Sequence, residues 1–245
     1  MNLTTVVPTR DRPEAVSEIF NCLNDTGYTG EILFCIDDDD PKRQQYFSQF
    51  DNAKLSKTYD ATMVSGPRLR CVGTLNKVVP TLVDSGRYDI IGFMGDDHRP
   101  RTHNFDNKIK AALADETGYA IAYGDDLLQG QNLPTAAWIR TDLIKSLGAF
   151  VPPKLKHLYF DDTHKTIGTE LGILIYLPDV IIEHMHPAAG KAEWSDQYRE
   201  LNSHAMYDHD SKEFARWKQE DWPTLKAKVI ADGFGQTGLW DALEL

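Results

Sequence analysis

Neighbouring carboxylates occur at several points of this sequence, although like charges repel one another when nothing neutralises them. The clusters are Asp37 to Asp40, Asp96-Asp97, Asp125-Asp126 and Asp161-Asp162. Turns and loop caps are the simplest use of such residues. Carboxylate oxygens are also the ligands that divalent cations take in phosphate-binding sites. The clusters are therefore candidates for a site that holds a cation together with phosphate groups.

Three polar groups come directly after apolar segments that we expect to be buried strands. Thr9-Arg10 follows residues 3–7, Asp37-Asp38 follows residues 31–36, and Asp96-Asp97 follows residues 89–94. In parallel α/β sheets, ligands bind beyond the carboxyl ends of the strands. The sequence therefore predicts that these three groups meet at one edge of a sheet and form a site.

Extended and helical patterns alternate along the rest of the chain. Further strands are expected at 62–64, 119–123, 171–176 and 179–183, and helices at 13–23, 42–50, 75–85, 104–113 and 141–147. From about residue 192 the sequence is polar and helical to its end. This alternation predicts an α/β three-layer sandwich with a mostly parallel central sheet and a helical C-terminal extension.

The composition narrows the class of protein. The formal net charge of −11 disfavours a polyanion such as DNA as a partner. No apolar run approaches the roughly 18 residues of a membrane span, and the first residues have no secretory pattern, so we expect a cytoplasmic protein. Cys22, Cys35 and Cys71 have no metal-type spacing and are interpreted as reduced thiols.

The segments VVPTRDRPE, IDDDD and FMGDDHRPR resemble the GT-A glycosyltransferases, in particular their family-2-like group. The resemblance covers roughly residues 3–190 and places Asp96-Asp97 where the family has its DxD motif. Gly95 stands where that motif usually begins with Asp. The resemblance implies a Rossmann-like GT-A fold and transfer of a sugar from a nucleoside diphosphate, with Mn²⁺ or Mg²⁺ as cofactor. It also implies a nucleotide-sugar half at about 1–100, an acceptor half at about 101–190, and a lid loop with C-terminal helices at 191–245.

The resemblance also assigns donor-side roles to individual residues. It implies that Asp97 binds the metal and that Asp96 contacts the ribose or supports the metal ligands. Asp37 matches the acid that accepts a hydrogen bond from the base, which suits uracil and guanine equally. The remaining donor-binding candidates are Pro8, Thr9 and Arg10 of the first nucleotide loop, Arg68, Arg70 and Lys77 near the phosphates, and Lys191 of the lid loop.

The acceptor side carries the candidate base. AAWIRTDLIKSLGAF, followed by Asp161-Asp162, is similar to the acceptor segment of family-2 enzymes, where a Glu-Asp pair supplies the base of inverting transfer. The resemblance implies that Asp162 takes the proton of the acceptor hydroxyl, with Asp161 as its partner. The alternative is that the pair caps a helix from Thr163 onward.

His184 and His186 lie two residues apart on an expected strand and so point to the same face. Many GT-A enzymes use a late histidine as a third metal ligand, and imidazole favours Mn²⁺ over Mg²⁺. We expect one of the two, with His184 preferred, to bind the metal; the alternative is a histidine packed in the core. The loop at 187–198 is expected to be a lid whose Lys191, Asp196 or Tyr198 contacts phosphate.

Two other functions compete with the glycosyltransferase hypothesis. A sugar-nucleotide nucleotidyltransferase would carry a glycine-rich loop after its first strand, which PTRDRPE lacks. A non-catalytic module that binds nucleotide sugars or glycans would not need the base and metal ligands. The acceptor stays open among glycans, small molecules and modified nucleic acid. FMGDDHRPRTHNFD also resembles phage and bacterial proteins, so a hydroxylated base of phage DNA is a minor hypothesis, with the host cytoplasm as the location.

Overall fold

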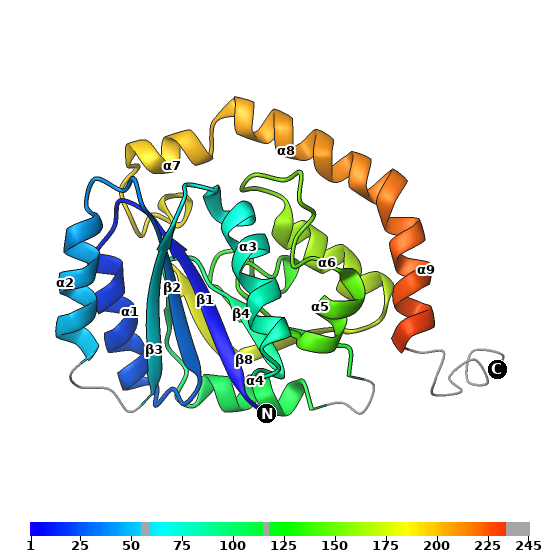
Figure 1. Cartoon of the computed structure of the whole chain (residues 1–245), viewed down its shortest axis with the longest axis horizontal. Helices are drawn as coiled ribbons and strands as arrows, with labels where there is room; N and C mark the ends of the chain where they lie inside the picture. The colour runs from blue at the N-terminus through cyan, green and yellow to red at the C-terminus, as the bar shows by residue number, and fades with distance from the viewer. Residues whose placement is uncertain (55–58, 115–117, 234–245) are drawn as a thin grey trace.

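The computed structural model describes all residues except 55–58, 115–117 and 234–245 (Figure 1). In the described part of the chain, eight strands form a sheet in the order β3-β2-β1-β4-β7-β6-β8-β5. The strands are β1 (Leu3–Thr9), β2 (Glu31–Asp37), β3 (Asp60–Gly66), β4 (Ile90–Phe93), β5 (His98–Pro100), β6 (Ile121–Asp125), β7 (Ala137–Arg140) and β8 (Leu174–His184). β1 to β4 are parallel to their neighbours in the first half of the sheet, whereas β7 runs antiparallel to β4 and β6.

Helices cover both faces of this sheet. The α-helices are α1 (Glu14–Asp25), α2 (Arg43–Lys54), α3 (Arg70–Asp84), α4 (Phe105–Ala112), α5 (Thr141–Leu147), α6 (Phe160–Glu170), α7 (Asp196–Leu201), α8 (His204–Arg216) and α9 (Trp222–Gly233). Short 3₁₀ turns occur at η1 (Gly130–Asn132) and η2 (Pro187–Ala189), and the π-helical turn η3 (Trp217–Asp221) joins α8 to α9. α1, α2 and α4 pack into one apolar core, and α3, α5, α6 and α9 pack into the other. The predicted three-layer α/β fold is confirmed.

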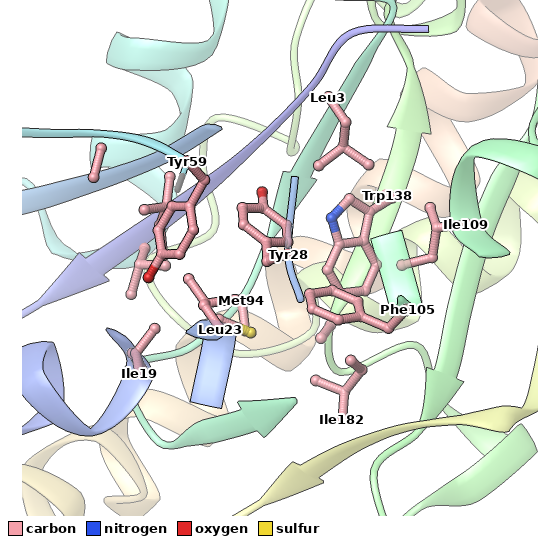
Figure 2. Close-up of a cluster of buried hydrophobic side chains, with 14 of the residues drawn as sticks. Leu3, Ile19, Leu23, Tyr28, Tyr59, Met94, Phe105, Ile109, Trp138 and Ile182 are labelled. Atoms are coloured by element: carbon pink, nitrogen blue, oxygen red, sulfur yellow. The ribbon is translucent and has the colours of Figure 1, made fainter. Parts of the chain in front are cut away.

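Alternating side chains of β1 supply both cores. Leu3 and Val7 belong to one apolar cluster and Val6 to the other, as the two-residue repeat of a strand requires. In the first cluster Trp138 of β7 lies beside Phe105, with ring centroids 6.0 Å apart (Figure 2). A Cβ at Gly92 of β4 would lie 2.2 Å from the Trp138 ring, so this glycine makes room for the indole. Packing in these two apolar clusters holds in place the strands whose carboxyl ends form the site.

Some elements differ from the sequence prediction. Residues 171–176 and 179–183 were expected as two strands, but 174–184 form the single strand β8. The short strands β5 and β7 were not predicted, because three or four residues between loops carry little periodicity. No helix within the described residues is long and apolar enough to cross a membrane. Helices α7 and α8 arch over the carboxyl-end side of the sheet, and α9 descends at the side of the molecule next to α5 (Figure 1). The division at residue 190 stays a prediction.

Candidate active site

The carboxyl ends of β1, β2 and β4 open into a cleft of about 470 Å³. The start of α3, the loop before α6, the end of β8 and helix α7 complete its walls. The predicted site residues that line it are Pro8, Thr9, Arg10, Asp37, Arg68, Arg70, Asp96, Asp97, Asp161, His184 and His186. The three strand-end groups therefore meet at one edge of the sheet, as the sequence predicts.

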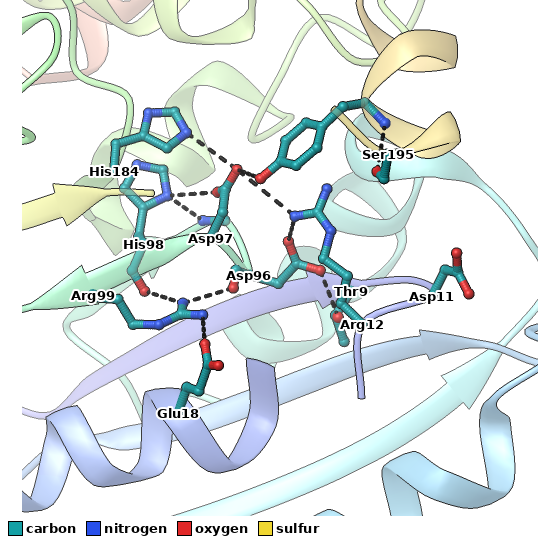
Figure 3. Close-up of polar contacts among 12 residues, drawn as sticks. Thr9, Asp11, Arg12, Glu18, Asp96, Asp97, His98, Arg99, His184 and Ser195 are labelled. Atoms are coloured by element: carbon teal, nitrogen blue, oxygen red, sulfur yellow. Dashed lines mark hydrogen bonds and ion pairs between the residues drawn. The ribbon is translucent and has the colours of Figure 1, made fainter. Parts of the chain in front are cut away.

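Asp97 lies in the cleft beside the stacked imidazole rings of His98 and His184 (Figure 3). Its carboxylate is 3.4 Å from His98 Nδ1 and 3.3 Å from His184 Nε2. The two rings stack with centroids 4.1 Å apart. Asp97, His98 and His184 each offer one ligand atom, and these three atoms lie within 4.8 Å of one another. A carboxylate oxygen with two imidazole nitrogens is a set of ligands that Mn²⁺ accepts. These side chains fit a divalent cation.

The charges of this group depend on one another. Burial would raise the pKa of Asp97, but the hydrogen bonds and charges of His184 and His98 hold that pKa well below its usual value. Burial would lower the pKa of His184, but Asp126 and Asp97 together raise it to about 9. Burial and the neighbouring His184 lower the pKa of His98. Near neutral pH His184 is therefore protonated and neutralises Asp97, and a divalent cation bound here would take the place of that proton.

Gly95 explains why the acidic motif begins with a glycine. A Cβ at this position would lie 2.6 Å from Asp97 Oδ1 and 2.9 Å from His98 Nδ1. Its backbone N–H donates to His98 Nδ1 at 3.2 Å. A side chain here would push Asp97 or His98 out of place, so the glycine belongs to the tight turn that brings them together.

Asp96 points away from the histidines and is held by β1 and the turn after it (Figure 3). Thr9 Oγ1 donates to one carboxylate oxygen at 2.7 Å, and Arg12 contacts the other at 2.8 Å. The Arg12 guanidinium also lies 3.9 Å from the ring centroid of Tyr198. Arg12 is a site residue that the sequence prediction missed, although it is the second arginine of PTRDRPE.

His98 is a second missed residue. The sequence prediction paired His184 with His186, but His98 is the imidazole that stands beside Asp97 and His184. His186 lines the cleft with its ring centroid 5.2 Å from that of His184, and its Nδ1 accepts from the backbone of Ala188. The antiparallel register of β5 and β8 places His98 opposite His184, which a search along the sequence does not reveal. Its position directly after Asp97 was the available signal.

Asp37 and Arg10 line the cleft at the end of β2. Arg10 donates to Asp37 at 2.9 Å and to Asp39 at 2.6 Å. Burial raises the pKa of Asp37, and Arg10 opposes that rise. Asp37 is therefore a partly buried hydrogen-bond acceptor at the end of β2, and its contact with a donor base stays a prediction.

Helix α7 fills part of the cleft with two side chains. Tyr198 donates from its hydroxyl to Asp97 Oδ2 at 2.8 Å. Glu200 lies 3.3 Å from Arg68 and 3.0 Å from Arg70. Both predicted phosphate-side arginines thus face the cleft, where an acidic side chain of the same chain neutralises them.

Three predicted site residues do not line the cleft. Lys77 is exposed on α3, seven residues and so roughly 10 Å along the helix axis from Arg70. Lys191 is held 2.8 Å from Glu183 on the outer side of β8. Asp162 follows Asp161 in the first turn of α6, but only Asp161 faces the cleft.

Asp161 differs from its neighbour in environment. Burial and the nearby charge of Asp162 raise the pKa of Asp161 to about 7. Its Oδ1 accepts from the backbone N–H of Asp162 at 3.0 Å. Helix α6 begins at Phe160, so both acids stand in its first turn, where the helix dipole favours negative charge. The alternative that the pair caps a helix from Thr163 onward is wrong, because α6 already begins at Phe160 and Tyr159 occupies its N-cap position.

Comparison with known proteins identifies the fold. No protein-family model matches the chain, and no curated protein matches it. Among solved structures, the mannosyltransferase PcManGT from Pyrobaculum calidifontis, in complex with GDP-Man and Mn²⁺, is similar with a TM-score of 0.60 and 15% identity, over 98% of this chain and 87% of that chain.

Two further glycosyltransferase structures show the same similarity. Glucosyl-3-phosphoglycerate synthase from Mycobacterium tuberculosis, in complex with Mn²⁺, UDP-Glc and phosphoglyceric acid, gives a TM-score of 0.57 at 13% identity over 87% of this chain and 78% of that chain. S. aureus TarS 1–349 gives a TM-score of 0.52 at 14% identity over 95% of this chain and 81% of that chain. The chain therefore has the GT-A fold of these proteins.

Proposed function

We propose that this chain is a metal-dependent glycosyltransferase that moves a sugar from a UDP- or GDP-linked donor to an acceptor hydroxyl. The observation that carries the proposal is the group of Asp97, which follows β4, with His98 and His184 in the lining of one cleft. Arginines line the same cleft. The similar structures of PcManGT and glucosyl-3-phosphoglycerate synthase contain a nucleotide sugar and Mn²⁺, which supports this class.

The donor would bind along the ends of β1 and β2. Asp37 accepts from the base, and the loop of Pro8 to Arg10 borders the nucleoside. Arg68 and Arg70 neutralise the diphosphate, a role for which guanidinium groups are well suited. Glu200 would leave these arginines when phosphate oxygens take its place.

The cation would be held by Asp97, His98 and His184. When bound, Mn²⁺ or Mg²⁺ supplies the positive charge that stabilises the leaving diphosphate. Asp96 already has both oxygens engaged by Thr9 and Arg12, so we assign it to the support of Asp97 and to the ribose side. Imidazole nitrogens favour Mn²⁺ over Mg²⁺ as the cation.

We assign the base to Asp161 in place of Asp162. Asp161 faces the cleft, and its pKa of about 7 suits a group that takes a proton near neutral pH. A carboxylate that deprotonates the acceptor hydroxyl during direct attack on the anomeric carbon leads to inversion. Asp162, behind it, contributes negative charge that raises the basicity of Asp161.

A thermal-shift screen tests the donor and metal assignment. The full chain is heated with UDP, GDP, CMP or TDP, each in Mn²⁺, Mg²⁺ or EDTA, since a ligand of the folded state raises Tm. We expect UDP or GDP to raise Tm only with metal, most strongly with Mn²⁺. Absence of any metal-dependent shift contradicts the proposal. Hydrolysis is then measured with nucleotide sugars that carry the nucleoside diphosphate found to raise Tm. A rise in Tm without hydrolysis or transfer indicates a binding module.

A further inference from the structure

One buried carboxylate outside the cleft lies behind both histidines. Asp126 follows β6, is 2% exposed, and does not line the cleft. Its Oδ1 accepts the backbone N–H groups of Leu128, Gln129 and Gly130 at 2.9, 2.6 and 2.9 Å. Its Oδ2 is left to face the histidine side. The loop thus holds the carboxylate rigidly in one orientation.

The second carboxylate oxygen of Asp126, Oδ2, faces His184 directly. Asp126 Oδ2 is 3.6 Å from His184 Nδ1, a buried nitrogen with no hydrogen-bond partner. The backbone N–H of His184 donates to the carbonyl of Asp126 at 2.9 Å and keeps the two residues side by side. A carboxylate oxygen only accepts, so it stabilises the form of His184 with the proton on Nδ1. Once a cation displaces the proton of Nε2, the lone pair of that nitrogen would point toward the Asp97 side.

The same oxygen reaches His98 through Thr135. Thr135 Oγ1 donates to Asp126 Oδ2 at 2.8 Å, which uses the one hydrogen of the hydroxyl. Thr135 must then accept from His98 Nε2, which is 3.4 Å away. This agrees with the backbone N–H of Gly95, which donates to His98 Nδ1 and so requires that nitrogen to be unprotonated. His98 Nδ1 and His184 Nε2 therefore both face the Asp97 side, and a cation bound to His98 Nδ1 would replace the Gly95 hydrogen bond at that nitrogen.

We propose that Asp126, acting directly on His184 and through Thr135 on His98, is the positioning residue that orients both imidazoles toward the cation site at Asp97. This inference rests on the proposed function, since it concerns the same cation. Outer carboxylates that accept from ligating histidines fix the tautomer and the ring orientation, and their loss lowers metal affinity by roughly 10–100-fold.

The test compares Mn²⁺ and Mg²⁺ binding of the full-length chain and its variants, measured by electron paramagnetic resonance of free Mn²⁺ and by competition with Mg²⁺. We expect Asp126→Asn to weaken Mn²⁺ binding by roughly 10–100-fold and to change Mg²⁺ binding much less, because imidazole matters more to Mn²⁺. Equal loss for both cations, or unchanged Mn²⁺ affinity in a folded variant, overturns the proposal. The ratio of Mn²⁺ to Mg²⁺ affinity distinguishes an effect of Asp126 on the two histidines from a general disruption of the site, which would weaken binding of both cations equally.

Thr135 supplies a milder pair of variants in case Asp126→Asn does not fold. Thr135→Val keeps the shape of the side chain and removes the link to His98, so we expect a smaller loss of Mn²⁺ affinity in the same direction. Thr135→Ser retains the hydroxyl and is expected to bind as the wild type does. Equal binding by the valine and serine variants contradicts the relay. If the wild-type chain binds no Mn²⁺ at all, the proposed function itself fails, which is a different result from an unaffected variant.

Discussion

The strand ends and the C-terminal arm (residues 196–233) both line the cleft, but they hold their polar side chains differently. Asp97 and His98 stand in a tight turn after the buried strand β4, packed against His184. The arm contributes Tyr198 and Glu200 from the six-residue helix α7, and the arginine contacts of Glu200 are partly exposed ion pairs. Exposed ion pairs contribute little free energy. The strand-end side is thus built before a ligand arrives, whereas the arm can exchange its contacts for those of a ligand.

We expect the largest loss of activity when the proposed base is replaced, and the two neighbouring acids of α6 allow a direct comparison. Asp161→Asn should lower the transfer rate by about 10²–10⁴-fold with donor binding retained, because the amide cannot take the proton. Asp162→Asn should lower it much less. Single-turnover transfer rates of both variants check this. A larger loss in Asp162→Asn would return the base to that residue.

The pH profile of transfer sharpens the same assignment. Since the pKa of Asp161 is raised to about 7, the residue is mostly protonated below that pH and ionised above it. We expect the rate to fall as pH decreases through 7 and to level off at higher pH. Rates measured from pH 5.5 to 9 with a fixed excess of Mn²⁺ test this, and a profile flat across pH 7 contradicts the role.

Removal of Asp97, the carboxylate proposed to bind the cation, should impair the strand-end side of the cleft and leave the C-terminal arm unchanged. Asp97→Ala is expected to lower metal-dependent affinity for UDP or GDP by about 100-fold, since a metal contributes several kcal/mol. Titration calorimetry with Mn²⁺ and with EDTA measures the difference. Asp38→Ala, an exposed acid of the loop after β2, is the matched control and should bind as the wild type does. Donor affinity in Asp97→Ala equal to that of the control would exclude the metal role.

The arm has one buried anchor of its own. Asp210 of α8 is fully buried and accepts the backbone N–H groups of Lys156, His157 and Leu158, which hold the loop before α6 against the arm. Asp210→Ala leaves these donors unpaired and should lower the free energy of unfolding by about 2 kcal/mol or more. Urea unfolding checks this, with the exposed Asp208→Ala as control. Equal stability of the two variants would show that α8 does not fix the loop.

We expect the smallest change in nucleotide affinity when the exposed ion pairs of Glu200 on α7 are removed. Glu200→Gln removes the charge that neutralises Arg68 and Arg70, so phosphate no longer competes with it. An exposed ion pair contributes up to about 1 kcal/mol, which corresponds to roughly 5-fold tighter nucleoside diphosphate binding. Titration calorimetry measures it against Glu193→Gln, an exposed change in the preceding segment. Weaker binding would mean that Glu200 supports the donor site instead of occupying it.

The sequence alone determined the three-layer fold and one edge of the site. Apolar runs that end in Thr9, Asp37 and Asp96-Asp97 predicted which strand ends converge, because parallel strands bring their carboxyl ends together. These signals are local: each polar group directly follows the strand that carries it. The donor-side residues at the ends of β1, β2 and β4 all line the cleft for this reason.

Only the tertiary structure decided which residues from distant segments meet there. His98 joins His184 through the β5–β8 register, and Asp126 lies behind both across a separate loop. The choice of Asp161 over Asp162 depends on the direction in which α6 begins, since neighbours in a helix point about 100° apart. A polar group at the end of a strand can be predicted from the residues next to it in the sequence. Contacts between side chains of different elements depend on strand pairing and packing, which no single segment specifies.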